Sequence, residues 1–206
     1  LLSIGTQFLV LPLAASWHMP GPAAVPLPLS DDSLTSVSLG FALPLPTGSS
    51  SQWGVCSNGF LYPHAGTSTQ FSPTVPGLLG GDERLAICFT DLNPTLGGRV
   101  LFEATPLVSY LTFDNVVEFG GTGTATFQVA FRPFGQIDVL YGPITIVNKA
   151  RLVGYSPGGG AIDPGPRDLS LGATFLTDFR DEESLALVAS GRPVLGTSMQ
   201  LSIARI

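Results

Sequence analysis

The sequence predicts an all-β fold: an antiparallel β-sandwich, jelly-roll-like, with long Gly/Pro-rich loops and an extended apolar N-terminal arm. Apolar and polar residues alternate over several short segments, which is the period of a half-buried strand. Turn residues separate these segments, and the chain contains 25 glycines and 18 prolines, more than helices tolerate. No stretch sustains a helical period beyond a turn or two near residues 183–189. Many short strands with frequent turns indicate a sandwich.

The clearest strand signal is the stretch 124–142, TATFQVAFRPFGQIDVLYG. Phe127, Val129 and Phe131 alternate with smaller or polar residues, and the alternation resumes after a Pro/Gly turn. Two such arms predict an antiparallel hairpin that lines the core. We expect Gln128, Gln136 and Asp138 to be its solvent-facing or edge polar groups.

The composition of the 206 residues favours burial over disorder. Hydrophobic residues make up 44% and charged residues only 12%, against roughly 25% charged residues in typical soluble domains. The formal net charge of −6 leaves no basic patch for phosphate contacts, so nucleic acid is excluded as a partner.

Residues 1–29 form an arm of their own. The apolar stretch 1–15 lacks a basic start and is interrupted by Pro12, which predicts a strand of the mature protein rather than a signal peptide or membrane span. Because the chain has no initiating Met, we expect that a leader or upstream region has been removed. The following prolines favour an extended strap, laid on the domain surface or docked on a neighbouring subunit. The assembly residues expected in this arm are Ile4, Phe8, Val10 and Trp17.

The main domain is predicted over residues 30–180. Its expected strands and strand pairs are 37–45, 53–62 (bent at Ser57-Asn58-Gly59), 85–89, 99–114 (bent at Thr105-Pro106), 115–119, 124–142 and 144–155. Asn-Gly supplies the positive φ angles that a tight turn needs. Residues 47–52 are predicted as a turn, and residues 64–81 and 156–170 as loops.

The C-terminal part is predicted to contain two further strands, 171–179 and 194–206, separated by the acidic patch 181–183. Residues 181–206 either close the sandwich or begin a following unit.

Cys56 and Cys88 are the two cysteines. Their spacing contains no CxxC motif, which argues against a metal or thioredoxin-like site. They would form a disulfide, a redox pair or two inert thiols, and a disulfide is expected if the protein is exported.

The sequence contains no catalytic constellation. The two histidines, His18 and His64, lie outside any nucleophile motif, and His64 is predicted to be an exposed loop residue. The carboxylates that a glycosidase would need all lie at turns or strand ends, where Asp commonly caps the backbone: Asp91, Asp114, Glu118, Asp138, Asp163 and Asp168. The chain is therefore predicted not to be an enzyme.

Two ligand classes remain. No cofactor is predicted. Calcium is the one alternative, because oxygen atoms of loop residues suit Ca²⁺. The residues that could coordinate it are Asp31, Asp32, Asp91, Asn93, Asp163 and Asp168. No alternating Asp array supports them. A glycan platform would use exposed aromatic residues, for which the candidates are Trp17, Trp53, Tyr62 and Tyr155, although a sandwich core takes aromatic residues first.

Six segments together resemble a nidogen-like extracellular β-domain that recurs in large secreted bacterial surface proteins. These are LGFALPLP (39–46), CSNGFLYP (56–63), ICFTDLNPTLGG (87–98), LTFDNVVEF (111–119), TFQVAFRPFGQIDVLYG (126–142) and LVGYSPGGGAIDPGPRDLS (152–170). The resemblance covers roughly residues 30–180. Phe89 and Thr90 depart from it, since they replace the family's usual Trp and first Asp.

The resemblance implies an extracellular, non-enzymatic module and carries no catalytic residues. It also places Cys56 and Cys88 beside the family's two signature turns, where a local disulfide would fit. The sequence thus predicts a secreted structural or adhesive module of the cell surface or matrix, self-assembling into a filament through its N-terminal arm. A carbohydrate-binding module of a larger secreted protein is the alternative.

Overall fold

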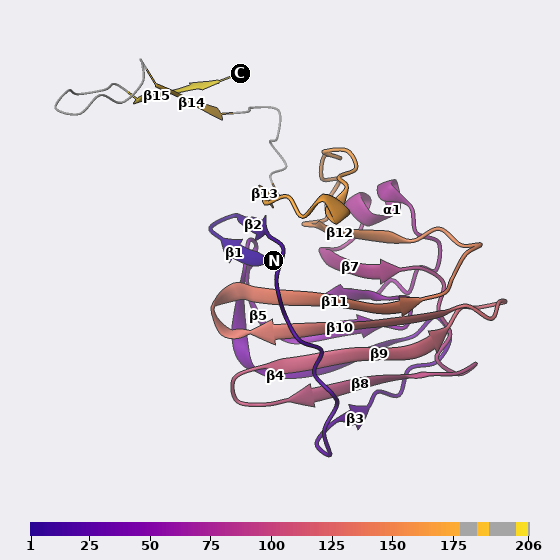
Figure 1. The fold of residues 1–206 in the computed structure, drawn as a ribbon. Coiled ribbons are helices and arrows are strands. Elements are labelled where there is room, and N and C mark those ends of the chain that lie inside the picture. The colour runs from indigo at the N-terminus through magenta and orange to yellow at the C-terminus, as the bar shows by residue number, and fades with distance from the viewer. Residues whose placement is uncertain (178–184, 190–200, 206) are drawn as a thin grey trace.

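Two antiparallel sheets pack face to face in the computed structural model, which describes residues 1–177, 185–189 and 201–205 (Figure 1). The larger sheet has eight strands among these residues, in the order β13, β2, β1, β11, β10, β9, β8, β3. Their bounds are Phe175–Leu176, Gln7–Val10, Leu2–Ile4, Gln136–Ile144, Thr124–Arg132, Ser109–Val117, Arg99–Ala104 and Val25–Pro26. The predicted all-β sandwich is confirmed.

The smaller sheet has five described strands in the order β12, β7, β6, β5, β4. Their bounds are Leu152–Ser156, Arg84–Phe89, Phe60–Tyr62, Gly48–Cys56 and Leu34–Leu45. Two expectations were wrong here. Residues 48–52 continue β5 rather than forming a turn, and the loop 64–81 contains a short helix, α1 (Val75–Gly80), which Thr74 caps with its side-chain oxygen.

The main core lies between the sheets. Phe127, Val129 and Phe131 of β10 point into it, and Trp53 of β5 meets Phe131 with ring centroids 4.9 Å apart. A second, smaller cluster lies on the outer face of the five-stranded sheet, where Leu78 of α1 covers it. Burial on both faces explains why every residue of β7 is buried.

The hairpin β10–β11 occupies the middle of the larger sheet, as its alternation predicted. Of the three polar residues expected at its solvent-facing or edge positions, Gln136 is half-buried, but Gln128 and Asp138 are not solvent-facing. Gln128 is 1% exposed and Asp138 is 3% exposed. The reason is tertiary: the N-terminal arm crosses the outer face of this sheet and covers them.

The arm, residues 1–29, begins as a small hairpin of β1 and β2 that turns at Gly5, where φ is +59°. β1 pairs with β11, and β2 pairs with β13. The chain then descends as an extended strap across β11, β10, β9 and β8 and ends in β3, which pairs with β8 (Figure 1). The prolines of the strap favour this extended, unpaired course.

The C-terminal prediction is corrected in part. Leu185–Ala189 (β14), where a helical turn or two was expected, is a strand, and it pairs with Leu201–Arg205 (β15) as a separate two-stranded sheet. Of the strand expected at 171–179, only Phe175–Leu176 (β13) forms, because Leu171 instead ends a 3-10 helix, Leu169–Leu171, and residues 178–179 fall outside the described residues. The acidic patch 181–183 and residues 194–200 fall outside the described residues. Within the described part of the chain, no helix is long and apolar enough to span a membrane.

Candidate functional site

The polar groups that hold the strap form the most elaborate site in the described structure, and we call this group the latch: His18 and Gly21 of the strap with Glu103, Thr112 and Gln128 of the sheet. The three sheet residues come from the adjacent strands β8, β9 and β10 and project from the outer face. Because the inward positions on these strands are apolar, their alternation places polar side chains outward. The strap then buries those side chains.

Gln128 binds the strap as another peptide group would. Its Oε1 accepts a hydrogen bond from the backbone N–H of His18 at 2.9 Å, and its Nε2 donates to the backbone oxygen of His18 at 2.8 Å. The second amide hydrogen goes to Oγ1 of Thr112, also at 2.8 Å. The buried amide is thus satisfied on both sides, as a buried polar group requires.

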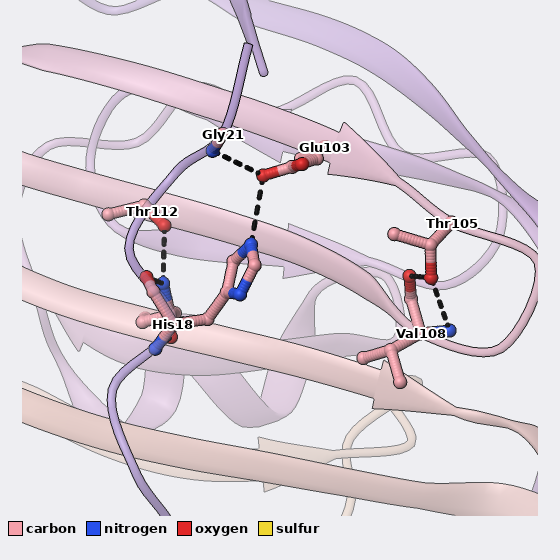
Figure 2. Close-up of polar contacts among 7 residues, drawn as sticks. His18, Gly21, Glu103, Thr105, Val108 and Thr112 are labelled. Carbon is pink, nitrogen blue, oxygen red and sulfur yellow. Dashed lines mark hydrogen bonds and ion pairs between the residues drawn. The ribbon is translucent and has the colours of Figure 1, made fainter. Parts of the chain in front are cut away.

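Glu103 is the second attachment point. Its Oε2 accepts from the backbone N–H of Gly21 and contacts Nε2 of His18, both at 2.9 Å, and Figure 2 shows both groups directed at this carboxylate. The hydrogen bond from Gly21, followed by that from His18, lowers the pKa of Glu103. A Cβ at position 21 would lie 3.0 Å from Oε1 of Glu103, so a side chain there would require the carboxylate to shift by a few tenths of an ångström. The His18 ring also stacks on Tyr110 at 3.8 Å between centroids.

A polar pocket of about 560 Å³ lies beside the latch, between strap residues 13–18 and the neighbouring ends of β9, β10 and β11. Its sheet side is formed by Tyr110, Arg132, Gln136 and Asp138. Nε of Arg132 donates to Oδ2 of Asp138 at 2.6 Å, and Nε2 of Gln136 donates to its Oδ1 at 2.7 Å. The buried carboxylate of Asp138 is therefore neutralised within the wall of the pocket.

A second, apolar groove of about 730 Å³ opens where the edge strand β12 faces β1, β2, β11 and β13. The loop 161–172 and α1 complete its walls. Several exposed apolar side chains belong to its lining: Leu11, Leu13, Val75, Val153, Ile162 and Leu176. Clusters of this kind mark surfaces that associate with other molecules.

The calcium candidates are only partly brought together. Carboxylate oxygens of Asp31, Asp32 and Asp91 lie within 4.8 Å of one another. Lys149 already pairs with Asp91 at 2.6 Å, and Asn58 donates to Asp32 at 2.7 Å. Burial, and then the charges of Asp32 and Asp91, raise the pKa of Asp31.

The remaining calcium candidates serve local turns or lie elsewhere. Oδ1 of Asn93 accepts from the backbone N–H of Thr95, and Oδ1 of Asp163 accepts from that of Gly165. Neither Asp163 nor Asp168 belongs to the acidic cluster.

The expected disulfide between Cys56 and Cys88 is not formed, and both cysteines are buried free thiols. Cys88 packs in the core between the sheets, whereas Cys56 packs in the outer cluster under α1. The two side chains thus lie on opposite faces of the five-stranded sheet. Burial raises the pKa of Cys56 to about 12 and that of Cys88 to about 11, so neither thiol is reactive at neutral pH.

Each histidine pairs with a glutamate that sequence patterns did not single out. Besides His18 with Glu103, Nδ1 of His64 contacts Oε2 of Glu83 at 2.9 Å. Thr47 and Tyr155 also donate their hydroxyls to Glu83. In a catalytic triad the hydroxyl would bind the imidazole instead. Among the described residues, neither imidazole has a hydroxyl or thiol bound to it.

The aromatic candidates divide by burial. Trp53 and Tyr62 belong to the two core clusters and cannot contact a glycan. Tyr155 is half-buried and packs edge-on against Phe8 at 4.8 Å. Trp17 alone among the four lines the polar pocket beside the latch.

The four expected assembly residues all lie in the arm that docks on its own sandwich. Phe8 is 1% exposed in the main core, Val10 pairs with Phe175 of β13, and Trp17 lines the polar pocket. Ile4 is exposed. The latch residues Glu103 and Gln128 were missed, and their only sequence signal was a polar residue amid apolar neighbours on a strand.

No family model matches the chain, and no significant match occurs among the curated proteins or the solved structures.

Proposed function

We propose that this chain is a non-catalytic structural or adhesive module, secreted to the cell surface or extracellular matrix, that joins copies of itself by exchanging the N-terminal arm. The secreted location is supported by the resemblance of residues 30–180 to a nidogen-like domain. Arm exchange is supported by the way the arm is attached.

The observation that carries the proposal is that the arm binds the sandwich at separate points, all of them distant in sequence. Leu2 pairs with Gln136, Phe8 packs against Tyr155, and His18 binds Gln128. Val25 pairs with Phe102 at the far edge of the sheet. Since these contacts do not depend on which chain supplies the arm, exchange between copies preserves them all.

The connection between the arm and β4 supplies a hinge, residues 30–33. Asp32 adopts a φ of +43°, which a non-glycine residue rarely does. Asp31, Asp32 and Asp91 crowd at the same place, and one buried oxygen of Asp31 has no protein hydrogen-bond partner among the described residues. A short hinge under strain favours the exchanged form, because opening the hinge relieves the strain.

We propose that the chain is not an enzyme because its largely buried carboxylates already bind other side chains or the strap. Glu83 accepts hydrogen bonds from three side chains, and Glu103 is occupied by the strap. Asp138 is held by Arg132 and Gln136. Across residues 1–177, 185–189 and 201–205, these carboxylates are engaged in contacts that stabilise the fold, and none has a further side-chain partner with which to act as an acid–base pair.

A cross-strand cysteine pair tests the exchange directly. Leu9 of β2 and Leu176 of β13 are antiparallel partners, and such partners lie about 4.5–5.5 Å apart at Cα, within the range of a disulfide. The variant carrying Leu9→Cys and Leu176→Cys should be oxidised at increasing protein concentration and separated on non-reducing gels. Arm exchange predicts a covalent ladder of dimers and higher species that collapses on reduction.

The single variant Leu9→Cys is the matched control. It should give no ladder beyond a dimer, and the buried Cys56 and Cys88 should not contribute. If the double variant yields only the internally linked monomer at every concentration, arm exchange is refuted.

A further inference from the structure

The polar pocket beside the latch has the donors and the aromatic surface of a sugar-binding site. Strap residues 13–18 form one wall, and Tyr110, Arg132, Gln136 and Asp138 form the other. A volume of about 560 Å³ lies within the usual range for small-ligand sites, about 300–1,000 Å³.

Three residues that line this pocket carry hydrogen-bond donors without a protein acceptor. Within the described residues, Nε1 of Trp17, the hydroxyl of Tyr110 and the Nη atoms of Arg132 have no hydrogen-bond partner. Both oxygens of Asp138, by contrast, are already occupied. A ligand that fits must therefore supply several acceptors, as sugar hydroxyls do.

The charges of the pocket favour a neutral ligand. The guanidinium of Arg132 is neutralised by Asp138 at 2.6 Å, and His18 faces the carboxylate of Glu103 at 2.9 Å. The chain also carries a formal net charge of −6, which repels polyanions at long range. An acidic polysaccharide is thus disfavoured relative to a neutral one.

Trp17 gives the pocket an apolar surface. It is half-buried, and an indole offers a flat face for the apolar face of a pyranose ring together with one donor at its edge. Tyr110 is held in place because His18 stacks on it with an interplanar angle of 13°. The tyrosine hydroxyl is therefore preoriented without a ligand.

We propose that this pocket binds a neutral pyranose unit of a carbohydrate, with Trp17 stacking on the ring while Tyr110 and Arg132 donate to its hydroxyls. The site lies partly on the strap, so it is complete only when an arm is docked. Binding goes beyond the assembly function and does not depend on arm exchange.

Tryptophan fluorescence offers a direct test, because Trp17 and Trp53 are the two tryptophans and Trp53 is buried in the core. The full chain should be titrated with maltose, cellobiose, lactose and chitobiose, and with digalacturonate as the acidic probe. At least one neutral disaccharide should shift the Trp17 emission in a saturable manner.

Two variants, one conservative and one a truncation, then locate the site. Tyr110→Phe keeps the stacking on His18 but removes the hydroxyl, and should weaken binding about three- to tenfold, as expected for one lost hydrogen bond. Trp17→Ala should weaken it about tenfold or more, measured by calorimetry. Tyr155→Phe, which removes a hydroxyl on another part of the molecule, should leave binding unchanged.

Three results would overturn the proposal: no saturable change with any neutral disaccharide, binding of digalacturonate alone, or equal binding by wild type, Tyr110→Phe and Trp17→Ala. Unchanged melting temperatures of the two variants establish that a loss of binding is not a loss of folding.

Discussion

Replacing Gln128 with alanine should release the middle of the strap while the sandwich stays folded. The side chain makes three hydrogen bonds, two to the backbone of His18 and one to Thr112. Each is worth about 0.5–1.5 kcal/mol net. Because the His18 side chain is 31% exposed, water can reach part of the released backbone and recover some of this energy. We therefore expect Gln128→Ala to lower the free energy of unfolding by about 2 kcal/mol.

The assay combines two measurements. Urea unfolding at neutral pH gives the loss in stability, with an unchanged m-value if the native state keeps its buried surface. Hydrogen exchange shows where in the chain the stability is lost. The backbone amide of His18 donates to Gln128, so it should lose its protection from exchange in the variant. The matched control is Gln52→Ala on β5, an exposed glutamine whose replacement should change stability by no more than about 0.5 kcal/mol.

A loss no larger than that of Gln52→Ala, with His18 still protected from exchange, would refute the role assigned to the latch. A large loss of stability without selective deprotection of the strap would also contradict it, because it would mean that Gln128 stabilises the whole sheet and not the strap.

Three further predictions concern charged groups. The folded-state pKa of Glu103 is lowered from 4.5, so its stabilisation of the docked strap is complete above pH 4.5 and is lost as pH falls through the folded pKa. Protease cleavage within the strap should therefore rise on acidification, and Glu103→Gln should abolish this pH dependence. Arg84 is 2% exposed with an unpartnered Nη1, so Arg84→Met should stabilise the protein by about 1 kcal/mol or more in thermal unfolding, and a comparable loss would contradict this. The pKa of Asp31 is raised above 3.8, so its ionisation lowers the stability of the folded protein as pH rises through the folded pKa. Asp31→Asn should therefore raise the free energy of unfolding by up to about 1 kcal/mol at neutral pH and leave it unchanged below pH 3.8. Melting curves of the two proteins at both pH values would show the difference.

The sandwich was largely predictable because strands leave a local record. Phe127, Val129 and Phe131 alternate along β10, and their inward positions follow from a two-residue period alone. The turn at Asn58-Gly59 was also predictable from the Asn-Gly pair, and the structure agrees: Gly59 adopts a φ of +76°. A side chain there would clash with the carbonyl oxygen of Cys88, so both the backbone angle and the packing require glycine.

The candidate sites were predictable only in part, because they depend on which segments meet. Trp17 was a glycan candidate by residue type, and it is the one that lines a pocket. Trp53 and Tyr62 were equal candidates by type, yet packing buries both. The disulfide failed for a related reason: Cys56 and Cys88 are close to the same turn, but the sheet separates their side chains.

The sequence by itself determined the fold class, the extended course of the N-terminal arm and the central hairpin 124–142. Each of these follows from local chemistry: alternation, proline geometry and turn residues. The tertiary structure alone decided what covers the outer face of that hairpin. Gln128 and Asp138 alternate as solvent-facing residues would, but a strap more than a hundred residues away in sequence from Gln128 lies across them. No local pattern records such a contact, because it depends on where the sheet places its surface after folding.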